Sequence, residues 1–212
     1  MSPNLLLDAL PEEIDGVPIV SDFRRMIQFE LLLQDEQVAE MARIPLALRL
    51  LYPGQIPPLE KAVNGLLWFY RCGAPSVQTL PQKKPPRAYD FAQDASLIYA
   101  AFWQIYQLDL NQASLHWWQF HALFCALPED CSLMKIMRYR TTDLSTLKGE
   151  EKTFIKHMQA KYRLSMSKRE RLPLQEVENQ AKAHVLSRFQ QAEQWTTHSV
   201  DTSSSGILPA EK

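Results

Sequence analysis

Residues 89–127 read YDFAQDASLIYAAFWQIYQLDLNQASLHWWQFHALFCAL, the most aromatic and most continuously apolar stretch of the chain. In its first half, apolar residues repeat at steps of four and three, which is typical of a helix packed along one seam. They are Phe91, Ala95, Ile98, Phe102 and Ile105. The second half is apolar nearly all round, which is typical of a helix in the middle of a fold. We therefore expect a central helical hairpin, joined at residues 107–111, on which the rest of the chain packs.

The N-terminal part of the chain predicts a short β-hairpin followed by a helix. Asp15-Gly16 is a strong two-residue turn signal and lies between short apolar strands. Ser21 or Asp22 then suits the N-cap of a helix that runs to about residue 34.

Two further helices are expected before the central stretch. The first starts near Asp35, and the residues that it turns inward are Val38, Met41, Leu48 and Leu51. It should be kinked or interrupted at Pro45, because proline has no backbone N–H to donate. The second opens at Pro57 or Pro58, since proline fits the first turn of a helix.

Three helices are expected after the central stretch. Residues 130–140 suggest a short helix. Asp143 or Ser145 suits the N-cap of the next, which runs to about Leu164 and carries Phe154 on its apolar side. Residues 174–195 give a last, polar helix.

Together these patterns predict an all-α fold of about six to eight helices with a short N-terminal β-hairpin. We expect residues 1–168 to form a single helical domain, in which the proline-rich residues 74–88 make an exposed surface loop. Residues 169–195 then form a polar C-terminal helix, and residues 196–212 a disordered tail.

Charge and composition narrow the classes of partner. Apolar residues make up 46% of the chain and charged residues 22%, with a net charge of −1, so no whole-chain field attracts nucleic acid or an acidic membrane. Residues 1–60 hold ten acidic and four basic side chains, and residues 148–172 hold eight basic and three acidic ones. These are either solvated helix faces or two ends that meet head to tail in self-association.

Cysteine usage and hydropathy favour a cytoplasmic protein. The three cysteines lie in apolar stretches at no framework spacing, which suits buried thiols in a reducing compartment. The N-terminus lacks the basic region of a signal peptide. The chain also lacks a run of ~18 apolar residues that could cross a membrane. We expect no membrane and no nucleic-acid partner.

Two carboxylates are candidates for acid–base chemistry. Asp90 and Asp94 are four residues apart, on one face of a helix, and paired carboxylates catalyse when their environments separate their pKa values. The alternative is structural, because both would lie in a first helical turn, where negative charge favours the helix dipole. A structural pairing with Arg138 or Arg140 is the version to test first.

His116, His121 and Cys125 are candidates for a metal or nucleophilic site. A zinc site needs four ligands, usually as close pairs from two segments, and a second pair is missing from the sequence. His116 has no nucleophile or carboxylate partner by motif, and no GxSxG, P-loop, HExxH or GxGxxG occurs. We expect no enzyme activity, no metal and no cofactor; a small metal-binding or enzymatic protein is the remaining alternative.

Several short motifs follow one another along the chain. They are Ser21-Asp22-Phe23-Arg24, Trp68-Phe69 before Cys72-Gly73, Tyr89-Asp90-Phe91 with Asp94, Ile98-Tyr99-Ala100-Ala101-Phe102, Tyr106 with Asp109-Leu110, Leu115-His116-Trp117-Trp118 with Phe120, and Met137-Arg138-Tyr139-Arg140 with Asp143. Over roughly residues 5–165, this set resembles the bacteriophage tail-morphogenesis proteins called gene-product-fifteen proteins. The chain after about residue 170 lies outside the resemblance.

The resemblance implies a phage or prophage protein from the tail gene cluster and carries no catalytic residues to transfer. It suggests a chaperone or adaptor that binds helices of the tape-measure protein or other tail components; a minor structural component of the virion tail is the alternative. Its location would be the host cytoplasm during assembly, or the virion tail. The side chains that could line a helix-binding groove, or else are core, are Trp103, Trp117, Trp118, Met134 and Met137. The candidate structural or partner-binding residues are Asp90, Asp94, His116, Trp117, Trp118, Arg138 and Arg140.

Overall fold

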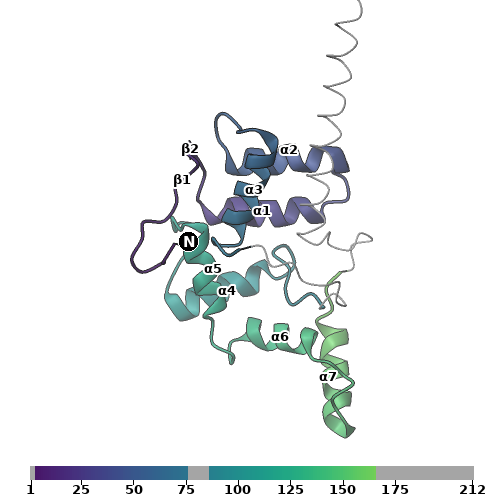
Figure 1. Ribbon diagram of the computed structural model, residues 1–212. Helices are drawn as coiled ribbons and strands as arrows, with labels where there is room; N and C mark the ends of the chain where they lie inside the picture. The colour runs from purple at the N-terminus through teal and green to yellow at the C-terminus, as the bar shows by residue number, and fades with distance from the viewer. Residues whose placement is uncertain (1–2, 76–85, 166–212) are drawn as a thin grey trace, which may run out of the picture.

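The structure, a computed structural model, describes residues 3–75 and 86–165 (Figure 1). Within these ranges it contains seven helices and one two-stranded antiparallel sheet, so the predicted fold class is confirmed. The elements are β1 (Glu13–Ile14), β2 (Val17–Pro18), α1 (Phe23–Gln34), α2 (Glu40–Leu51), α3 (Leu59–Tyr70), α4 (Ala95–Tyr106), α5 (Trp117–Cys125), α6 (Ser132–Thr141) and α7 (Gly149–Lys161).

The helices form three tiers (Figure 1). Helices α1, α2 and α3 form one end, α4 and α5 the middle, and α6 and α7 the other end. Helix α1 packs on both α2 and α5, α2 packs on α3, and α6 packs on both α4 and α7. The middle tier therefore joins the two ends, as expected for the central stretch.

The N-terminal hairpin and α1 follow the sequence closely. Ile14 pairs with Val17 across a turn in which both Asp15 and Gly16 have positive φ, as a two-residue hairpin turn requires. The side chain of Asp22 caps α1 by accepting a hydrogen bond from the N–H of Arg24 at 2.8 Å.

Helix α2 differs from its prediction at its start and in the position of Met41. It begins at Glu40 rather than near Asp35, and it continues through Pro45 without interruption. Met41 is 81% exposed, so its expected inward position was wrong. Leu48 and Leu51 are buried as expected, together with Ala47 and Arg43, and Arg43 lies about 200° round the helix from Met41.

The central hairpin has a longer connection than predicted. Helix α4 ends at Tyr106 and α5 starts only at Trp117, so residues 107–116 separate the helices. The carboxylate of Asp109 accepts bonds from the backbone N–H of Asn111 and the side-chain amide of Gln112, which holds the chain in a turn. Ile105, expected in the packed seam, is 41% exposed.

An aromatic cluster fills the middle of the fold. The ring of Phe120, on α5, is 1% exposed and stacks on Phe23 of α1 and Phe102 of α4, with ring centroids 4.7 and 5.0 Å apart. One side chain thus joins α5 both to α4, the helix before it, and to the distant helix α1.

Helices α6 and α7 form the far end. Helix α6 occupies the expected residues, but α7 begins at Gly149, after a turn in which Asp143 accepts the N–H of Ser145. The predicted caps for α7 were therefore wrong. Phe154 is 50% exposed and makes an edge contact with Tyr139, and none of the thirteen residues of α7 is buried. The reason is that α7 packs mainly on α6 alone.

Some predictions fall outside the described residues. They concern residues 76–85 of the proline-rich loop, the predicted helix at 169–195 and the predicted tail at 196–212. Within the described ranges, no helix is both long and apolar enough to cross a membrane.

Candidate functional site

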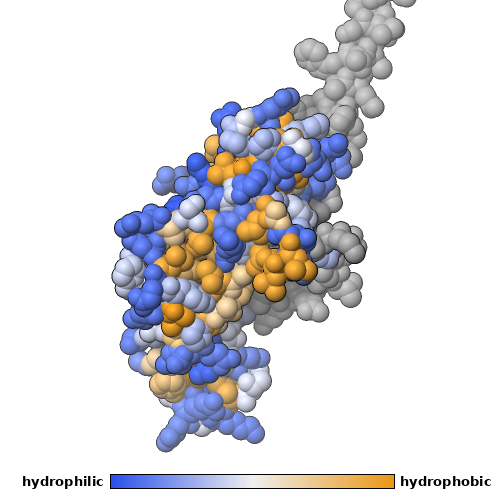
Figure 2. All heavy atoms as spheres, turned by 90° about the vertical axis from the view of Figure 1, so that its left-hand side faces the viewer, coloured by the Kyte–Doolittle hydropathy of each residue, from blue (hydrophilic) through white to orange (hydrophobic). Residues whose placement is uncertain are grey.

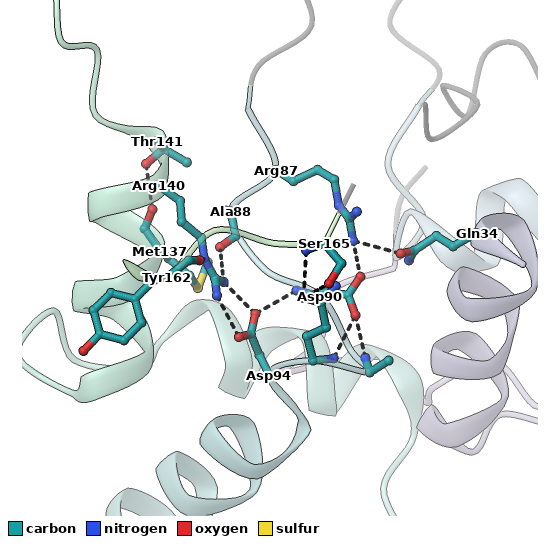
Figure 3. Close-up of polar contacts among 12 residues, drawn as sticks. Gln34, Arg87, Ala88, Asp90, Asp94, Met137, Arg140, Thr141, Tyr162 and Ser165 are labelled. Atoms are coloured by element: carbon teal, nitrogen blue, oxygen red, sulfur yellow. Dashed lines mark hydrogen bonds and ion pairs between the residues drawn. The ribbon is translucent and has the colours of Figure 1, made fainter. Parts of the chain in front are cut away.

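The two candidate carboxylates are buried at the start of α4 and each pairs with an arginine (Figure 3). Asp94 is 2% exposed and accepts two bonds from the guanidinium of Arg140, at 2.6 and 2.9 Å. Asp90 is 3% exposed and pairs with Arg87. Of the two partners considered from the sequence, the structure places Arg140 here, whereas Arg138 is exposed on α6.

We call four of these residues the clasp, because they join segments that are distant in the sequence: Arg87, Asp90, Asp94 and Arg140. Arg140 also donates to the carbonyl oxygens of Ala88 at 3.0 Å and of Tyr162, beyond α7, at 2.7 Å. Arg87 donates to the side-chain oxygen of Gln34 at the end of α1, at 2.9 Å. The clasp therefore joins α1, the segment before α4, α6 and the chain after α7.

The hydrogen bonding of the clasp favours a structural role over acid–base chemistry. Both oxygens of Asp94 face Arg140, and one of them also accepts the N–H of Asp90 at 2.9 Å. In the carboxylate of Asp90, one oxygen accepts the N–H groups of Ala92 and Gln93, and the second oxygen faces Arg87. Each carboxylate oxygen thus already has a donor, in keeping with the rule that buried charges are paired.

His116 is the N-cap of α5 rather than a residue within the helix. Its Nδ1 accepts the N–H of Trp118 at 3.0 Å, and its own N–H donates to the side chain of Gln119 at 3.1 Å, which completes a capping box. Its Nε2 lies 3.1 Å from the carbonyl oxygen of Pro11. Because a carbonyl only accepts, Nε2 carries the ring proton and Nδ1 is free to cap.

The two tryptophans after His116 hold the end of α3. The indole N–H of Trp117 donates to the carbonyl of Tyr70 at 2.9 Å, and that of Trp118 donates to the carbonyl of Phe69 at 2.8 Å. The last carbonyl groups of a helix have no hydrogen-bond donor within that helix, so the two indole N–H groups act as donors to them. Both side chains are 3% exposed, which makes them part of the core.

An apolar groove of about 330 Å³ lies between α5, α6 and residues 89–91. We call it the α5–α6 groove. Its walls are mostly aromatic and methionine side chains, including Tyr89, Phe91, Trp117, Phe124, Met134 and Met137. Three of the five residues proposed from the sequence as groove-lining, Trp117, Met134 and Met137, line it; Trp118 is core and Trp103 is exposed on α4.

Other apolar surface lies on the N-terminal side. The N-terminal segment, at the left of Figure 1, faces the viewer in Figure 2, where hydrophobic residues gather in several separate patches with hydrophilic residues between them. Leu6 and Leu7 of this segment are 90% and 82% exposed. A wider hollow of about 750 Å³ lies between the β-hairpin and residues 52–58.

Comparison with known families decides the assignment. The family model described as Bacteriophage Gp15 protein matches residues 6–164 of the chain. The chain belongs to the bacteriophage Gp15 protein family. The match covers the clasp, the His116 cap and the α5–α6 groove, and it confirms the resemblance seen over residues 5–165. Comparisons with curated proteins and with solved structures give no match.

The burial of the thiols in this Gp15 family member differs from the prediction. Cys125 is exposed and Cys72 and Cys131 are half-buried, so the expectation of three buried thiols was wrong for Cys125. The Cys125 sulfur lies 3.8 Å from Nδ1 of His121 on the rim of the groove. Within residues 3–75 and 86–165, no three His, Cys, Asp or Glu side chains form a group that could hold a metal ion.

Sequence reasoning missed three polar partners in the Gp15 fold. Arg87 was assigned to a surface loop, and its spacing of three residues from Asp90 gave no signal for their ion pair, because the chain there is not helical. Glu30 is 5% exposed on α1 and accepts the hydroxyl of Tyr70 at 2.6 Å. Gln34, at the end of α1, had no local signal because its partner Arg87 is 53 residues away.

The His116 cap predicts acid sensitivity. Burial lowers the pKa of His116 below its ordinary value of 6.5, while the Pro11 carbonyl and the Glu12 charge partly oppose this shift. Burial also lowers the pKa of His121. Below about pH 6.5 the unfolded chain therefore binds more protons than the folded one, and the free energy of unfolding should fall as pH decreases from 7 to 5.

Urea denaturation at a series of pH values measures this effect. His116→Asn keeps a capping side chain without a titrating ring, so its stability should fall less steeply with decreasing pH. His157→Asn, at an exposed site on α7, is the control and should keep the wild-type slope. Equal slopes in all three proteins would contradict the assigned role of His116.

Proposed function

We propose that this Gp15 family member is a non-enzymatic tail-assembly protein of a phage or prophage, acting by protein–protein binding. Its partner is the tape-measure protein or another tail component, for which it serves as chaperone or adaptor. It acts in the cytoplasm of the bacterial host during assembly. The α5–α6 groove is the observation that carries the proposal.

The chemistry of the groove suits the apolar face of a helix. Helix-binding proteins accept amphipathic helices by burying a few spaced apolar side chains in a hydrophobic groove. Met134 and Met137 are half-buried on α6, and methionine adapts its shape to different apolar partners. Tyr89, which is half-buried, adds aromatic surface, and aromatic residues are enriched where proteins bind one another. A volume of about 330 Å³ fits a few side chains rather than a whole helix.

Co-expression of the full chain with each neighbouring tail gene product, followed by pull-down, tests the proposal. We expect the tape-measure protein or one other tail protein to be retained and to be more soluble in the presence of this protein. If no tail protein is retained or made more soluble, the proposal fails. Mass spectrometry of purified virions separates the roles, because stoichiometric copies in the virion would indicate a structural component instead of a transient chaperone.

A charge in the groove should weaken capture strongly. Met134→Asp places a carboxylate where an apolar partner would be buried, and loss of a central contact typically costs 2 kcal/mol or more, roughly a 30-fold loss of affinity. Met41→Asp is the matched control, because Met41 is 81% exposed on α2, away from the groove. Circular dichroism checks that both variants remain folded. Equal capture by the two variants would place the partner on another surface.

A further inference from the structure

The described chain ends beside the α5–α6 groove. Ser165 donates from its N–H and its hydroxyl to the side-chain oxygen of Gln93, at 2.9 and 3.1 Å, and Figure 3 shows it next to Asp90. Phe91, which lines the groove, is two residues from Gln93, so the Cα atoms of the two are within roughly 7 Å. Neither Ser165 nor Gln93 lines the groove, but the chain that continues from Ser165 starts close to residues 89–91, which form one of its walls.

The sequence that follows carries an apolar stripe of helical spacing: Leu174, Val177, Ala181, Val185 and Phe189. An isolated helix of this length is marginal in water, so such a stripe needs an apolar surface to pack on. Residues 166–173 precede the stripe and span at most about 26–29 Å when extended. The stripe can therefore reach the groove from Ser165.

We infer that the apolar stripe at residues 174–189 docks on the α5–α6 groove of its own chain. Tethering favours this occupant, because a short linker gives an effective concentration in the millimolar range. The groove offers the aromatic and methionine surface that the stripe requires, and it accepts a few of its side chains. A tail protein that binds the groove must displace this segment; this last step rests on the proposed function, whereas the docking does not.

Cys125 is a natural reporter of the docking because it is exposed and lines the groove. In the full chain, its alkylation by a maleimide should be about tenfold slower than in the Val185→Asp/Phe189→Asp variant, as for a site that is covered ~90% of the time. Mass spectrometry of the labelled peptides separates Cys125 from the other two thiols.

A matched variant controls for added charge. Ser187→Asp/Gln191→Asp introduces the same two charges at the same spacing on the opposite side of the predicted helix, about 200° round. It should retain the slow alkylation of the unmodified chain. An equal rate at Cys125 in all three proteins overturns the inference.

Disulfide trapping identifies the occupant. Ala181 lies on the stripe, and Ala183 lies on the opposite face of the predicted helix. In the full chain at micromolar concentration, the Ala181→Cys variant should form an intramolecular disulfide with Cys125 under mild oxidation. The Ala183→Cys variant should not form this disulfide. A covalent dimer in place of the intramolecular bond would overturn the inference in favour of a second copy. Both tests use the chain without a tail protein. They can therefore fail while the pull-down succeeds, and they can succeed while the pull-down fails.

Discussion

Replacement of Arg140 by methionine is expected to lower the free energy of unfolding by about 3–5 kcal/mol. The side chains of Arg140 and Asp94 are only 9% and 3% exposed, so the substitution leaves a buried carboxylate without its cation. It also removes the donors to the carbonyls of Ala88 and Tyr162, which join the segment before α4 to the chain after α7. For a protein of this size, the melting temperature should fall by roughly 6–20 °C.

Arg138→Met is the matched control, because Arg138 lies on the same helix but is exposed. Its effect should stay within about 0.5 kcal/mol. The double variant Asp94→Leu/Arg140→Met should lose less than the sum of the two single changes, since removing both charges leaves no buried ion unpaired. Chemical denaturation measures the unmodified protein and four variants, which are Arg140→Met, Arg138→Met, Asp94→Leu and the double variant. Similar losses for Arg140→Met and Arg138→Met would show that the clasp contributes little to stability.

Phe120→Ala is expected to cost about 3–5 kcal/mol through the cavity it leaves in the core. The ring stacks on Phe23 and Phe102 and also lies 5.8 Å, centroid to centroid, from Trp117. Its loss therefore weakens the contacts of α5 with both α1 and α4. Because the middle tier joins the two ends, unfolding should remain a single cooperative transition at lower denaturant concentration.

Trp103→Ala provides the comparison for Phe120→Ala. Trp103 also belongs to the central stretch, but its side chain is 47% exposed. The truncation should cost about 1 kcal/mol or less, because roughly half of the apolar surface is already in water. A loss at Trp103 as large as that at Phe120 would mean that the outer face of α4 is covered, for example by a second copy.

The sequence predicted the clasp only in part. The spacing of Asp90 and Asp94 pointed to a shared structural role, and Arg140 was one of two arginines considered as their partner. Periodicity could not choose between Arg138 and Arg140, because helix α6 is short and the choice depends on which of its faces meets the start of α4. The separation of 46 residues between Asp94 and Arg140 removes any local signal for the pair.

The helix ends of the central stretch show the same limit. The pattern around His116 predicted a continuous helix, yet the chain there is extended and pairs with the start of α1. The N–H of Phe23 donates to the carbonyl of Leu115, and the N–H of Trp117 donates to the carbonyl of Ser21. These bonds to a distant segment fix where α5 begins.

The sequence by itself determined the helical class, the Asp15-Gly16 turn, a helix N-cap at Ser21 or Asp22 and the family of this protein. These features depend on residues a few positions apart, where turn chemistry, capping and apolar periodicity act directly on the backbone. Only the tertiary structure decided that His116 is a cap, that Trp118 is core, and that Met41 and Phe154 are exposed. Burial and helix ends depend on groups supplied by other segments, and the spacing within one segment does not encode those groups.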